Sequence, residues 1–346
     1  MFESGVLAEL TQTHRQGLRN LHRVEEALCN RFVGLEDPIR ALILAVASGE
    51  PLLLVGPPGT AKSRLIRAFC GLTGLLDEDN LERGHEAYFE YLLTPFTEPG
   101  ELFGFYDISQ MLNKGAEKQT LRRMDDGMMQ NATVVYLDEV FNGSSAILNS
   151  LLAFLNEGIF HDRGQRKKVK MKYLFAATNQ VPETGELRAV YDRFVLRCNV
   201  DNVEASPNEI DGLVSAGWKE TYGGQPEQNK FSSLLDEMEH LRYAIKERTA
   251  QGQLTPQRED PFYNSLAQLV EHARDFDLSE MSNRRLIKVV HIMLIHAIYR
   301  ATSSNGQTKE APQLGRPELI LIPQFFLDRT ELDVVERMKR VDIRGE

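Results

Sequence analysis

Leu52-Leu53-Leu54-Val55-Gly56-Pro57-Pro58-Gly59-Thr60-Ala61-Lys62-Ser63 joins a short apolar strand to a glycine-rich turn and to the first residues of a helix. The backbone N–H groups of such a turn, with the positive end of the helix that follows, form a concave site for phosphate groups. We expect Lys62 to reach the terminal phosphates and the Ser63 hydroxyl to bind Mg²⁺. The stretch from Gly56 to Arg64 is therefore the candidate nucleotide-binding loop.

Ala61 stands where this pattern has a glycine. Alanine adds a methyl group, but it can adopt helical φ and ψ, so we expect the turn to keep its shape. The alternative is a chance Gly/Pro turn before a helix. The order strand, turn, helix favours the phosphate-binding loop.

The composition is that of a soluble globular protein with room for about two domains: 346 residues, 42% apolar and 26% charged. The 50 acidic and 40 basic residues give a formal charge of −10, which argues against a dedicated duplex-DNA binder. Cys29, Cys70 and Cys198 are far apart without CxxC spacing, so we expect reduced thiols and no zinc site. No leader peptide and no membrane-length apolar stretch is visible, so we expect a cytoplasmic protein without a membrane span.

The first two hundred or so residues alternate between apolar strands and helices, which predicts a three-layer α/β domain with a parallel sheet over 1–204. Helical spacing predicts one amphipathic helix over 3–30, and Asp37 is expected to cap a second helix from Pro38 to Ala47. The further strands are predicted at Ala87–Leu93, Thr133–Leu137, Lys172–Ala177 and Phe194–Val200, with helices at Lys62–Leu72 and Ser144–Asn156.

After about residue 205 the apolar residues recur only at helical spacing, which predicts an all-helical domain over 205–346. Two polar stretches, Gly223–Lys230 and Ser303–Pro312, are expected to be solvent-exposed loops. Pro317 to Val341 is expected to form one or two closing helices.

Two adjacent carboxylates, Asp138 and Glu139, follow the apolar run that begins at Val134. A strand end beside the phosphate-binding loop is where an α/β sheet places its ligand. Asp138 is expected to hold Mg²⁺ through water, and Glu139 to orient and deprotonate an attacking water. Asn179, at the end of the next strand, is expected to hydrogen-bond that water or the γ-phosphate. The alternatives are a solvated acidic pair and an ordinary turn asparagine.

Two arginines, Arg188 and Arg193, lie in a short helix that leads to the last strand. An arginine at this edge of the domain could reach the nucleotide of a neighbouring subunit and stabilise the transition state there. Arg193 is favoured for this role, with Arg188 as the alternative or a helper. A surface salt bridge with Glu186 or Asp192 is the competing interpretation.

Ser282-Asn283-Arg284-Arg285 opens an apolar helix in the second half of the chain. An arginine in the first turn of a helix opposes the helix dipole and costs stability. We therefore expect Arg285, or otherwise Arg284, to contact the nucleotide phosphates, the alternative being an exposed arginine.

In this order, the motifs resemble those of the AAA+ ATPases, and among them the MoxR family, especially its RavA-like branch. The Ala-Lys-Ser variant of the phosphate-binding loop also occurs in that branch. The resemblance extends from about residue 20 to 340 and is strongest over the α/β half. It rests on Gly56–Ser63, Leu137–Val140, Asn149–Glu157, Ala177–Asn179, Tyr191–Phe194 and the segment Tyr91–Gly104.

The resemblance implies an AAA+ α/β domain followed by a helical lid, with ATP or ADP and Mg²⁺ bound between the subunits of a homo-oligomeric ring, expected to be a hexamer. Val33 and Gly34 would flank the adenine, Arg193 would be the arginine finger, Asn179 the first sensor and Arg285 the second sensor. A helix-2 insert at about 105–125 and a hairpin at about 158–172 would project toward the ring face or pore.

The implied function is ATP hydrolysis coupled to remodelling or chaperone-like maturation of a partner, often one with a von Willebrand factor A (vWA) domain. The alternative is a nucleic-acid motor that uses the basic residues of the hairpin, although the overall acidity disfavours it. A small-molecule kinase would leave the lid, Asn179 and Arg193 without a role. The basic residues of the hairpin are Arg163, Arg166, Lys167, Lys168, Lys170 and Lys172.

Overall fold

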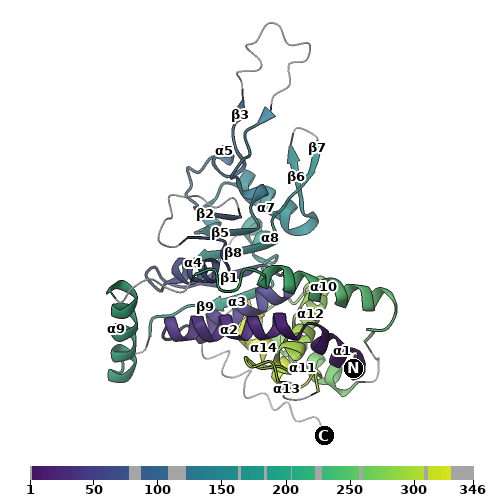
Figure 1. The fold of residues 1–346 in the computed structure, drawn as a ribbon. Helices are drawn as coiled ribbons and strands as arrows, with labels where there is room; N and C mark the ends of the chain where they lie inside the picture. Colours follow the sequence, from purple (N-terminus) through teal and green to yellow (C-terminus); the bar gives the residue numbers. More distant parts are fainter. Residues whose placement is uncertain are drawn as a thin grey trace.

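The computed structural model describes residues 2–77, 87–107, 122–162, 165–182, 185–203, 205–222, 228–256, 260–307 and 311–328. Figure 1 shows a sheet in the middle of the molecule, with strand ribbons projecting above it and helices gathered below it. Within these ranges, none of the helices combines the length and the hydropathy that a membrane span needs. Within the described ranges, Cys29, Cys70 and Cys198 are not joined by a disulfide bond.

A five-stranded parallel sheet forms the centre of the α/β domain, in the order β2-β5-β8-β1-β9. β1 leads into the phosphate-binding loop and lies between β8 and β9, so its four residues are almost completely enclosed. Because all the strands are parallel, their carboxyl ends share one edge of the sheet. The strands are β1 (Leu52–Val55), β2 (Tyr88–Leu92), β5 (Val134–Asp138), β8 (Tyr173–Thr178) and β9 (Leu196–Asn199), within two residues of the predicted bounds.

Helices cover both faces of this sheet, which confirms the predicted three-layer α/β fold. The buried side chains form two apolar clusters, one on each face, and the same strands contribute alternate residues to both. Val134 and Tyr136 face one cluster, whereas Val135 and Leu137 face the other. The covering helices are α2 (Arg15–Arg31), α3 (Glu36–Ser48) and α4 (Lys62–Leu72) on the first face and α7 (Ser145–Glu157) and α8 (Gly185–Tyr191) on the second.

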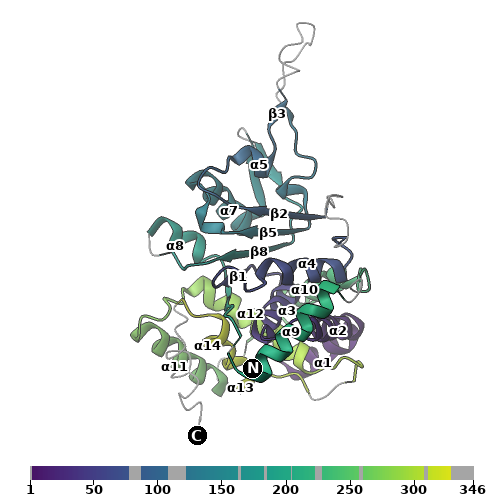
Figure 2. The ribbon, with the colours of Figure 1, turned by 90° about the vertical axis from the view of Figure 1, so that its left-hand side faces the viewer.

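The second half of the described chain is helical and packs against α2 and α3, so the first apolar cluster continues from the sheet into the lid (Figure 2). Here α10 and α12 both contact α3. The helices of this half are α9 (Pro207–Tyr222), α10 (Leu234–Ala250), α11 (Pro261–Asp275), α12 (Asn283–Arg300), α13 (Arg316–Leu319) and α14 (Leu321–Phe325). The part of the predicted closing helices beyond residue 328, and parts of both predicted polar loops, lie outside the described residues.

Two predicted helix boundaries were wrong. The helix expected over 3–30 is divided at His14 into α1 (Ser4–Thr13) and α2, because His14 leaves the helical conformation, with φ −100° and ψ 18°. The helix expected from Pro38 begins earlier, after Leu35, so that Asp37 lies in its first turn instead of capping it. An acidic residue in a first turn interacts favourably with the helix dipole, so Asp37 still suits this position.

Two small antiparallel ribbons project beyond the sheet, at the places predicted for the helix-2 insert and the hairpin. Asp162 in β6 joins them: its carboxylate accepts hydrogen bonds from Tyr106 Oη at 2.6 Å, from Lys167 Nζ at 2.8 Å and from Arg123 Nη2 at 3.2 Å. Burial raises the pKa of Asp162, but these donors outweigh it and lower the pKa to about 2. The outer part of the insert, 108–121, lies outside the described residues. The ribbons are β3 (Tyr106–Asp107) with β4 (Arg122–Arg123), and β6 (Ile159–Asp162) with β7 (Gln165–Lys168).

The phosphate-binding loop reaches α4 through a left-handed residue, and this residue is Ala61, with φ 63° and ψ 20°. The expectation that Ala61 holds right-handed helical angles was therefore wrong. The pattern has glycine here because the position needs a positive φ, which costs a residue with a Cβ about 1–2 kcal/mol. The loop keeps its shape, and Ala61 bears that strain.

Replacement of Ala61 by glycine tests this strain. Ala61→Gly is expected to leave the unfolding temperature unchanged or to raise it, because relief of about 1–2 kcal/mol of backbone strain offsets the greater freedom of glycine in the unfolded chain. The matched control is Ala244→Gly inside α10, which should lose about 1 kcal/mol. Equal destabilisation of both variants in thermal unfolding would contradict a strained Ala61.

Candidate nucleotide-binding site

A pocket of about 440 Å³ lies at the carboxyl edge of the sheet, where the ends of β1, β5 and β8 meet. The structure here brings together the loop, the acidic pair and the asparagine that the sequence singled out. The residues lining it are Pro58, Gly59, Thr60, Ala61, Lys62, Ser63, Arg64, Arg67, Asp138, Glu139 and Asn179.

Lys62 is buried at the base of this pocket, and its ammonium group binds the loop itself. Nζ donates hydrogen bonds to the carbonyl oxygens of Gly56 at 2.7 Å and Pro57 at 2.8 Å. Burial lowers the pKa of Lys62 below its ordinary value, and Asp138 and Glu139 oppose part of that shift. Lys62 is therefore a cation held between the loop and the acidic pair, where a terminal phosphate could replace the carbonyl oxygens as its partner.

Glu139 is held in a left-handed conformation, with φ 50° and ψ 47°, directly after β5. Its backbone N–H donates to Asp138 Oδ1 at 3.0 Å, which fixes the carboxylate of Asp138 beside the turn. A non-glycine residue at positive φ costs energy and is found preferentially at functional sites. The strained turn therefore places the two adjacent carboxylates at the pocket and lets the backbone orient that of Asp138.

The donor set of the pocket fits Mg²⁺. The Ser63 hydroxyl begins α4 and the Asp138 carboxylate ends β5, and both line the pocket. Hydroxyl, carboxylate and phosphate oxygens are the ligands that Mg²⁺ takes when it binds with a nucleotide, usually with several waters retained. Two protein oxygens beside a phosphate-binding loop are therefore a sufficient donor set.

Arg67 also lines the pocket, and sequence reasoning missed it. Its guanidinium forms a double hydrogen bond with the Glu90 carboxylate of β2, with the shortest contact at 2.6 Å. Arg67 lies one helical turn after Ser63, so that both face the same side of α4. That spacing is the signal that could have identified it. Arg67 adds a positive charge to the pocket wall, besides Lys62 and Arg64.

Asn179 is exposed at the end of β8, on the wall of the pocket beside the acidic pair. The preceding Thr178 is buried, and its side chain donates to the Gln180 carbonyl oxygen at 2.9 Å. This bond closes the turn and leaves the Asn179 side chain directed to the pocket surface. The site therefore offers an amide group on the pocket wall, at the end of the strand that neighbours β1.

Val33 and Gly34 do not line the phosphate pocket. They form the turn between α2 and α3, where Gly34 has φ 74° and an added Cβ would lie 2.5 Å from Val203 Cγ1. Val33 instead lies beside α9, where a Cβ on Gly212 would be 3.6 Å from Val33 Cγ1. Val33 and Gly34 therefore lie beside Gly212 and Val203, outside the lining of the phosphate pocket.

Arg193 and Arg284 line a different pocket from the phosphate-binding loop, together with Lys288. Among the residues that the structure describes, Arg193 Nε is buried with no hydrogen-bond partner, and the ion pair of Arg193 with Asp192 is long, at 3.9 Å. Arg188, in contrast, pairs with Glu280 of the lid at 3.2 Å. The structure thus keeps Arg193 away from the phosphate-binding loop of its own chain, with an unsatisfied donor.

Arg285 is not where the sequence predicts it, because its side chain is only 2% exposed and does not line the phosphate pocket. It donates to the Ser279 hydroxyl at 3.1 Å, to the Phe326 carbonyl oxygen at 2.8 Å and to the Asp328 carboxylate. The buried ion pair of Arg285 with Asp328 therefore offsets the unfavourable placement of an arginine in the first turn of α12. Of the two adjacent arginines, Arg284 is the exposed one.

The whole fold is similar to that of a candidate ATPase from Cytophaga hutchinsonii with a solved structure. The TM-score is 0.62, with 96% of each chain covered. The two sequences are only 14% identical, so this likeness concerns the fold alone.

Three relatives share sequence with the chain. Two uncharacterized proteins of Methanocaldococcus jannaschii are each 34% identical, over 193 and 188 residues, which make up 56% and 54% of this chain and 47% and 46% of theirs. A structural protein of Acidianus two-tailed virus is 27% identical over 228 residues, 65% of this chain and 34% of that protein. The match thus spans about half the length of the two Methanocaldococcus proteins.

Residues 19–243 match the MoxR domain of the MoxR-vWA-β-propeller ternary systems. This range contains the phosphate-binding loop, the acidic pair, Asn179 and Arg193, and it covers more than half of the chain. The parallel sheet, the helical lid and this match agree, and the chain belongs to the MoxR family of AAA+ proteins.

Proposed function

We propose that this chain is a Mg²⁺-dependent ATPase that works as a ring and uses hydrolysis to remodel a partner protein. One observation carries the proposal: Lys62, Ser63, Asp138, Glu139 and Asn179 line a single pocket, although they come from three different strand ends. Family membership supports the nucleotide chemistry.

In the proposed reaction, the backbone N–H groups of the loop and the Lys62 ammonium bind the β- and γ-phosphates of ATP. Ser63 and Asp138 would hold Mg²⁺, which neutralises charge on the transferred phosphoryl group. Glu139, fixed by its strained turn, would orient a water and accept its proton. Asn179 would hydrogen-bond that water or the γ-phosphate, and Val33 with Gly34 would border the adenine.

Arg193 and Arg284 support a site that is completed between subunits. Both lie outside the phosphate pocket of their own chain, and Arg193 Nε has no hydrogen-bond partner within the described part of the chain. Arg193 is therefore the better candidate for the finger than the paired Arg188. We assign the proposed role of second sensor to the exposed Arg284 instead of to Arg285, for which the sequence predicted it. A hexameric ring and the RavA-like branch remain predictions.

Family membership indicates which class of protein the proposed partner belongs to. The MoxR domain that matches is named for systems that also contain a vWA protein and a β-propeller, so we infer a vWA-domain protein as the partner of this chain. A chaperone-like role in the cytoplasm is consistent with that partnership.

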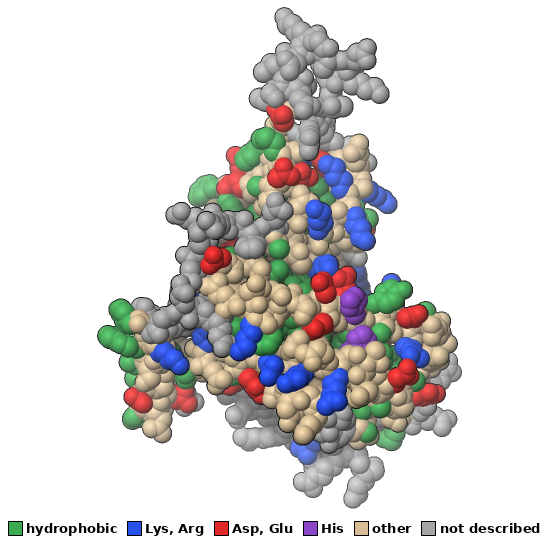
Figure 3. All heavy atoms as spheres, in the orientation of Figure 1, with side chains coloured by type: hydrophobic (Ala, Val, Ile, Leu, Met, Phe, Trp, Pro, Cys, Tyr) green, Lys and Arg blue, Asp and Glu red, His purple; other side chains and the backbone are tan. Residues whose placement is uncertain are grey.

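The nucleic-acid alternative rests on the exposed basic strand β7, visible as blue side chains on the hairpin in Figure 3. Lys167 forms an ion pair with Asp162, and Lys172 forms one with Glu239, with Nζ 2.5 Å from Oε2. Arg163 lies outside the described residues. Two of the six positive charges are thus neutralised by the protein itself, which weakens the case for a phosphate-backbone groove.

Replacement of the proposed base tests the chemistry. Glu139→Gln is expected to bind ATP as the parent does but to hydrolyse it about a hundredfold more slowly or worse, because the amide cannot accept a proton. Phosphate release and binding of a fluorescent ATP analogue measure the two effects, and removal of Mg²⁺ should stop hydrolysis in the parent. The matched control is Lys62→Ala, which should lose binding itself. Unchanged turnover would exclude Glu139 as the base.

A mixing experiment tests the proposed finger. Arg193→Ala should bind ATP yet hydrolyse it at least about a thousandfold more slowly, the scale of arginine fingers in phosphoryl transfer. Mixed with Glu139→Gln, it should regain part of the activity, because mixed rings contain sites with both an intact base and an intact neighbouring arginine. Arg188→Ala is the control and should retain most activity. Absence of recovery, with ring formation intact, would argue against action between subunits.

The Glu139→Gln variant held with ATP also separates the two classes of partner. It should retain a purified vWA-domain protein and release both DNA and RNA at low salt, whereas Lys62→Ala should retain neither class. Tight nucleic-acid binding that is lost on replacing Arg166 and Lys168 with alanine would reverse this conclusion.

A further inference from the structure

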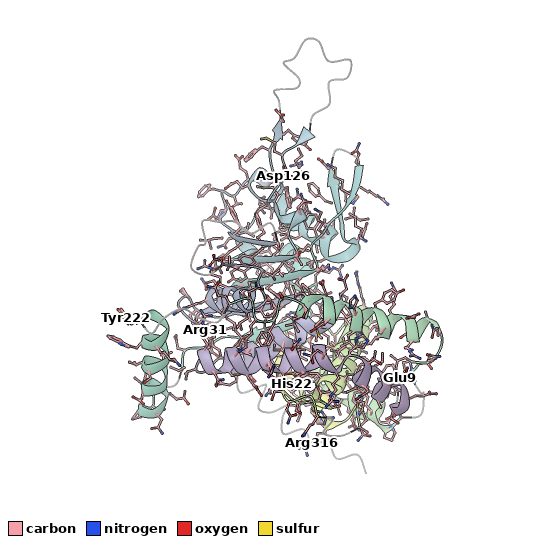
Figure 4. All side chains as sticks on the ribbon, viewed as in Figure 1. Glu9, His22, Arg31, Asp126, Tyr222 and Arg316 are labelled. Atoms are coloured by element: carbon pink, nitrogen blue, oxygen red, sulfur yellow. The ribbon has the colours of Figure 1, made fainter. Side chains whose placement is uncertain are left out.

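A small group of polar side chains lies where α4 approaches β2 and β5, beside the phosphate pocket. In Figure 4 these three elements lie between the labelled Asp126 above and Arg31 below, and side chains fill the space between them. One member of the group, on α4, also lines the pocket, so the group connects the pocket to the strands. Its members are Arg67 of α4, Tyr88 and Glu90 of β2, and Tyr136 of β5.

Glu90 is the hydrogen-bond acceptor of this group. Its carboxylate accepts the double hydrogen bond of Arg67, with the shortest contact at 2.6 Å, and Tyr88 Oη donates to Oε2 at 2.9 Å. The ion pair is only partly buried, with 39% of the Arg67 side chain and 23% of the Glu90 side chain exposed. Because neither charge is enclosed in an apolar interior, the pair can open without the cost of a fully buried single charge.

Tyr136 is the member of the group without a partner. Its side chain is completely buried, and among the residues that the structure describes its hydroxyl has no hydrogen-bond partner. In the parallel register of β2 and β5, Tyr136 pairs with Glu90, so the two side chains leave the sheet on the same face. Burial raises the pKa of Tyr136, and the charges of Asp138 and Glu90 raise it further. The unused O–H group therefore lies close to the carboxylate that Arg67 occupies.

Arg67 is placed on the side of the pocket where terminal phosphate oxygens would bind. It faces the same side of α4 as Ser63, the proposed ligand of Mg²⁺, and both line the pocket. In nucleotide sites this metal ion bridges oxygens of the β- and γ-phosphates. A guanidinium can bind two phosphate oxygens in the way it binds two carboxylate oxygens. A terminal phosphate would therefore compete with Glu90 for Arg67.

We propose that Arg67 exchanges Glu90 for the terminal phosphate when ATP binds, and that the Tyr136 hydroxyl then donates to Glu90. The Glu90 carboxylate would keep two donors, the hydroxyls of Tyr88 and Tyr136, so it stays hydrogen-bonded after Arg67 leaves. ADP lacks the terminal phosphate and would leave Arg67 on Glu90. The inference rests on the proposed nucleotide site, and it adds a device that distinguishes ATP from ADP.

Replacement of each partner of the ion pair should have opposite effects on ATP binding. Arg67→Gln is expected to weaken binding of a fluorescent, non-hydrolysable ATP analogue at least about tenfold, the scale of a hydrogen bond to a charged group, and to affect fluorescent ADP far less. Glu90→Gln is expected to strengthen binding of the ATP analogue, because an amide competes less well for the guanidinium. Arg67→Lys keeps the charge and should recover part of the preference for ATP. A purely structural ion pair predicts that Arg67→Gln and Glu90→Gln weaken both nucleotides alike, and that result would overturn the exchange.

Removal of single hydroxyl groups tests the part assigned to Tyr136. Tyr136→Phe should leave the unfolding temperature of the nucleotide-free protein unchanged or higher, because it deletes a buried hydroxyl without a partner, yet it should weaken binding of the ATP analogue severalfold. Tyr88→Phe deletes a bonded hydroxyl and should lower the unfolding temperature. Tyr263→Phe deletes a second hydroxyl without a described partner, away from the pocket, and should leave both affinities as in the parent. If Tyr136→Phe lost as much stability as Tyr88→Phe, the Tyr136 hydroxyl would already have a partner, and its part in the exchange would be overturned.

ATP turnover of the parent separates this inference from the proposed function. A parent that hydrolyses ATP, in which Arg67→Gln weakens the ATP analogue and ADP by the same factor, overturns the exchange and leaves the ATPase standing. Opposite effects of Arg67→Gln and Glu90→Gln in a parent that binds ATP without hydrolysing it support the exchange and overturn the ATPase. A parent that binds neither nucleotide overturns both.

Discussion

The close approach of Gly56 to β9 is the constraint on which the site depends. A Cβ on Gly56 would lie 2.0 Å from the Val200 carbonyl oxygen, and the Gly56 N–H donates to the Thr178 carbonyl oxygen at 3.0 Å. The first residue of the loop is therefore held tightly between the ends of β8 and β9. This position places Lys62 in one pocket with the ends of β5 and β8. A larger residue at this point would displace the loop from the acidic pair.

This fixed frame allows strain at two positions that face the pocket. Ala61 and Glu139 both hold positive φ, and each borders the place where phosphate chemistry is proposed. Such conformations persist only where the surrounding structure determines them, and here the buried strands and α4 do so. The free energy gained by burying the strands thus maintains the strained turn that holds Glu139 at the pocket.

Sequence patterns correctly predicted those structural features that depend on residues close together in the chain. The apolar runs predicted all five strands of the sheet, and the predicted bounds of α4 agree with the structure. The phosphate-binding loop fixes where that helix starts. Arg285 was misplaced because its partner, Asp328, follows more than forty residues later and no local pattern reveals the pair. The pairing of Arg67 with Glu90 could not be predicted for the same reason, although the spacing of Arg67 from Ser63 could have placed it at the pocket. The backbone conformation of Ala61 was predicted wrongly because helical propensity gives no information on the turn that precedes a helix.

The Arg285 network also explains how the lid could act on the neighbouring subunit. Asp328 accepts from Arg285 of α12 and from the fully buried Arg197 of β9, so one carboxylate ties the lid to the finger side of the sheet. Burial raises the pKa of Asp328, and the two arginines outweigh it and lower that pKa. Removal of one member would leave an uncompensated buried charge, so this junction resists opening. In the proposed ring, lid, Arg284 and Arg193 would then move as one body against the nucleotide of the next subunit.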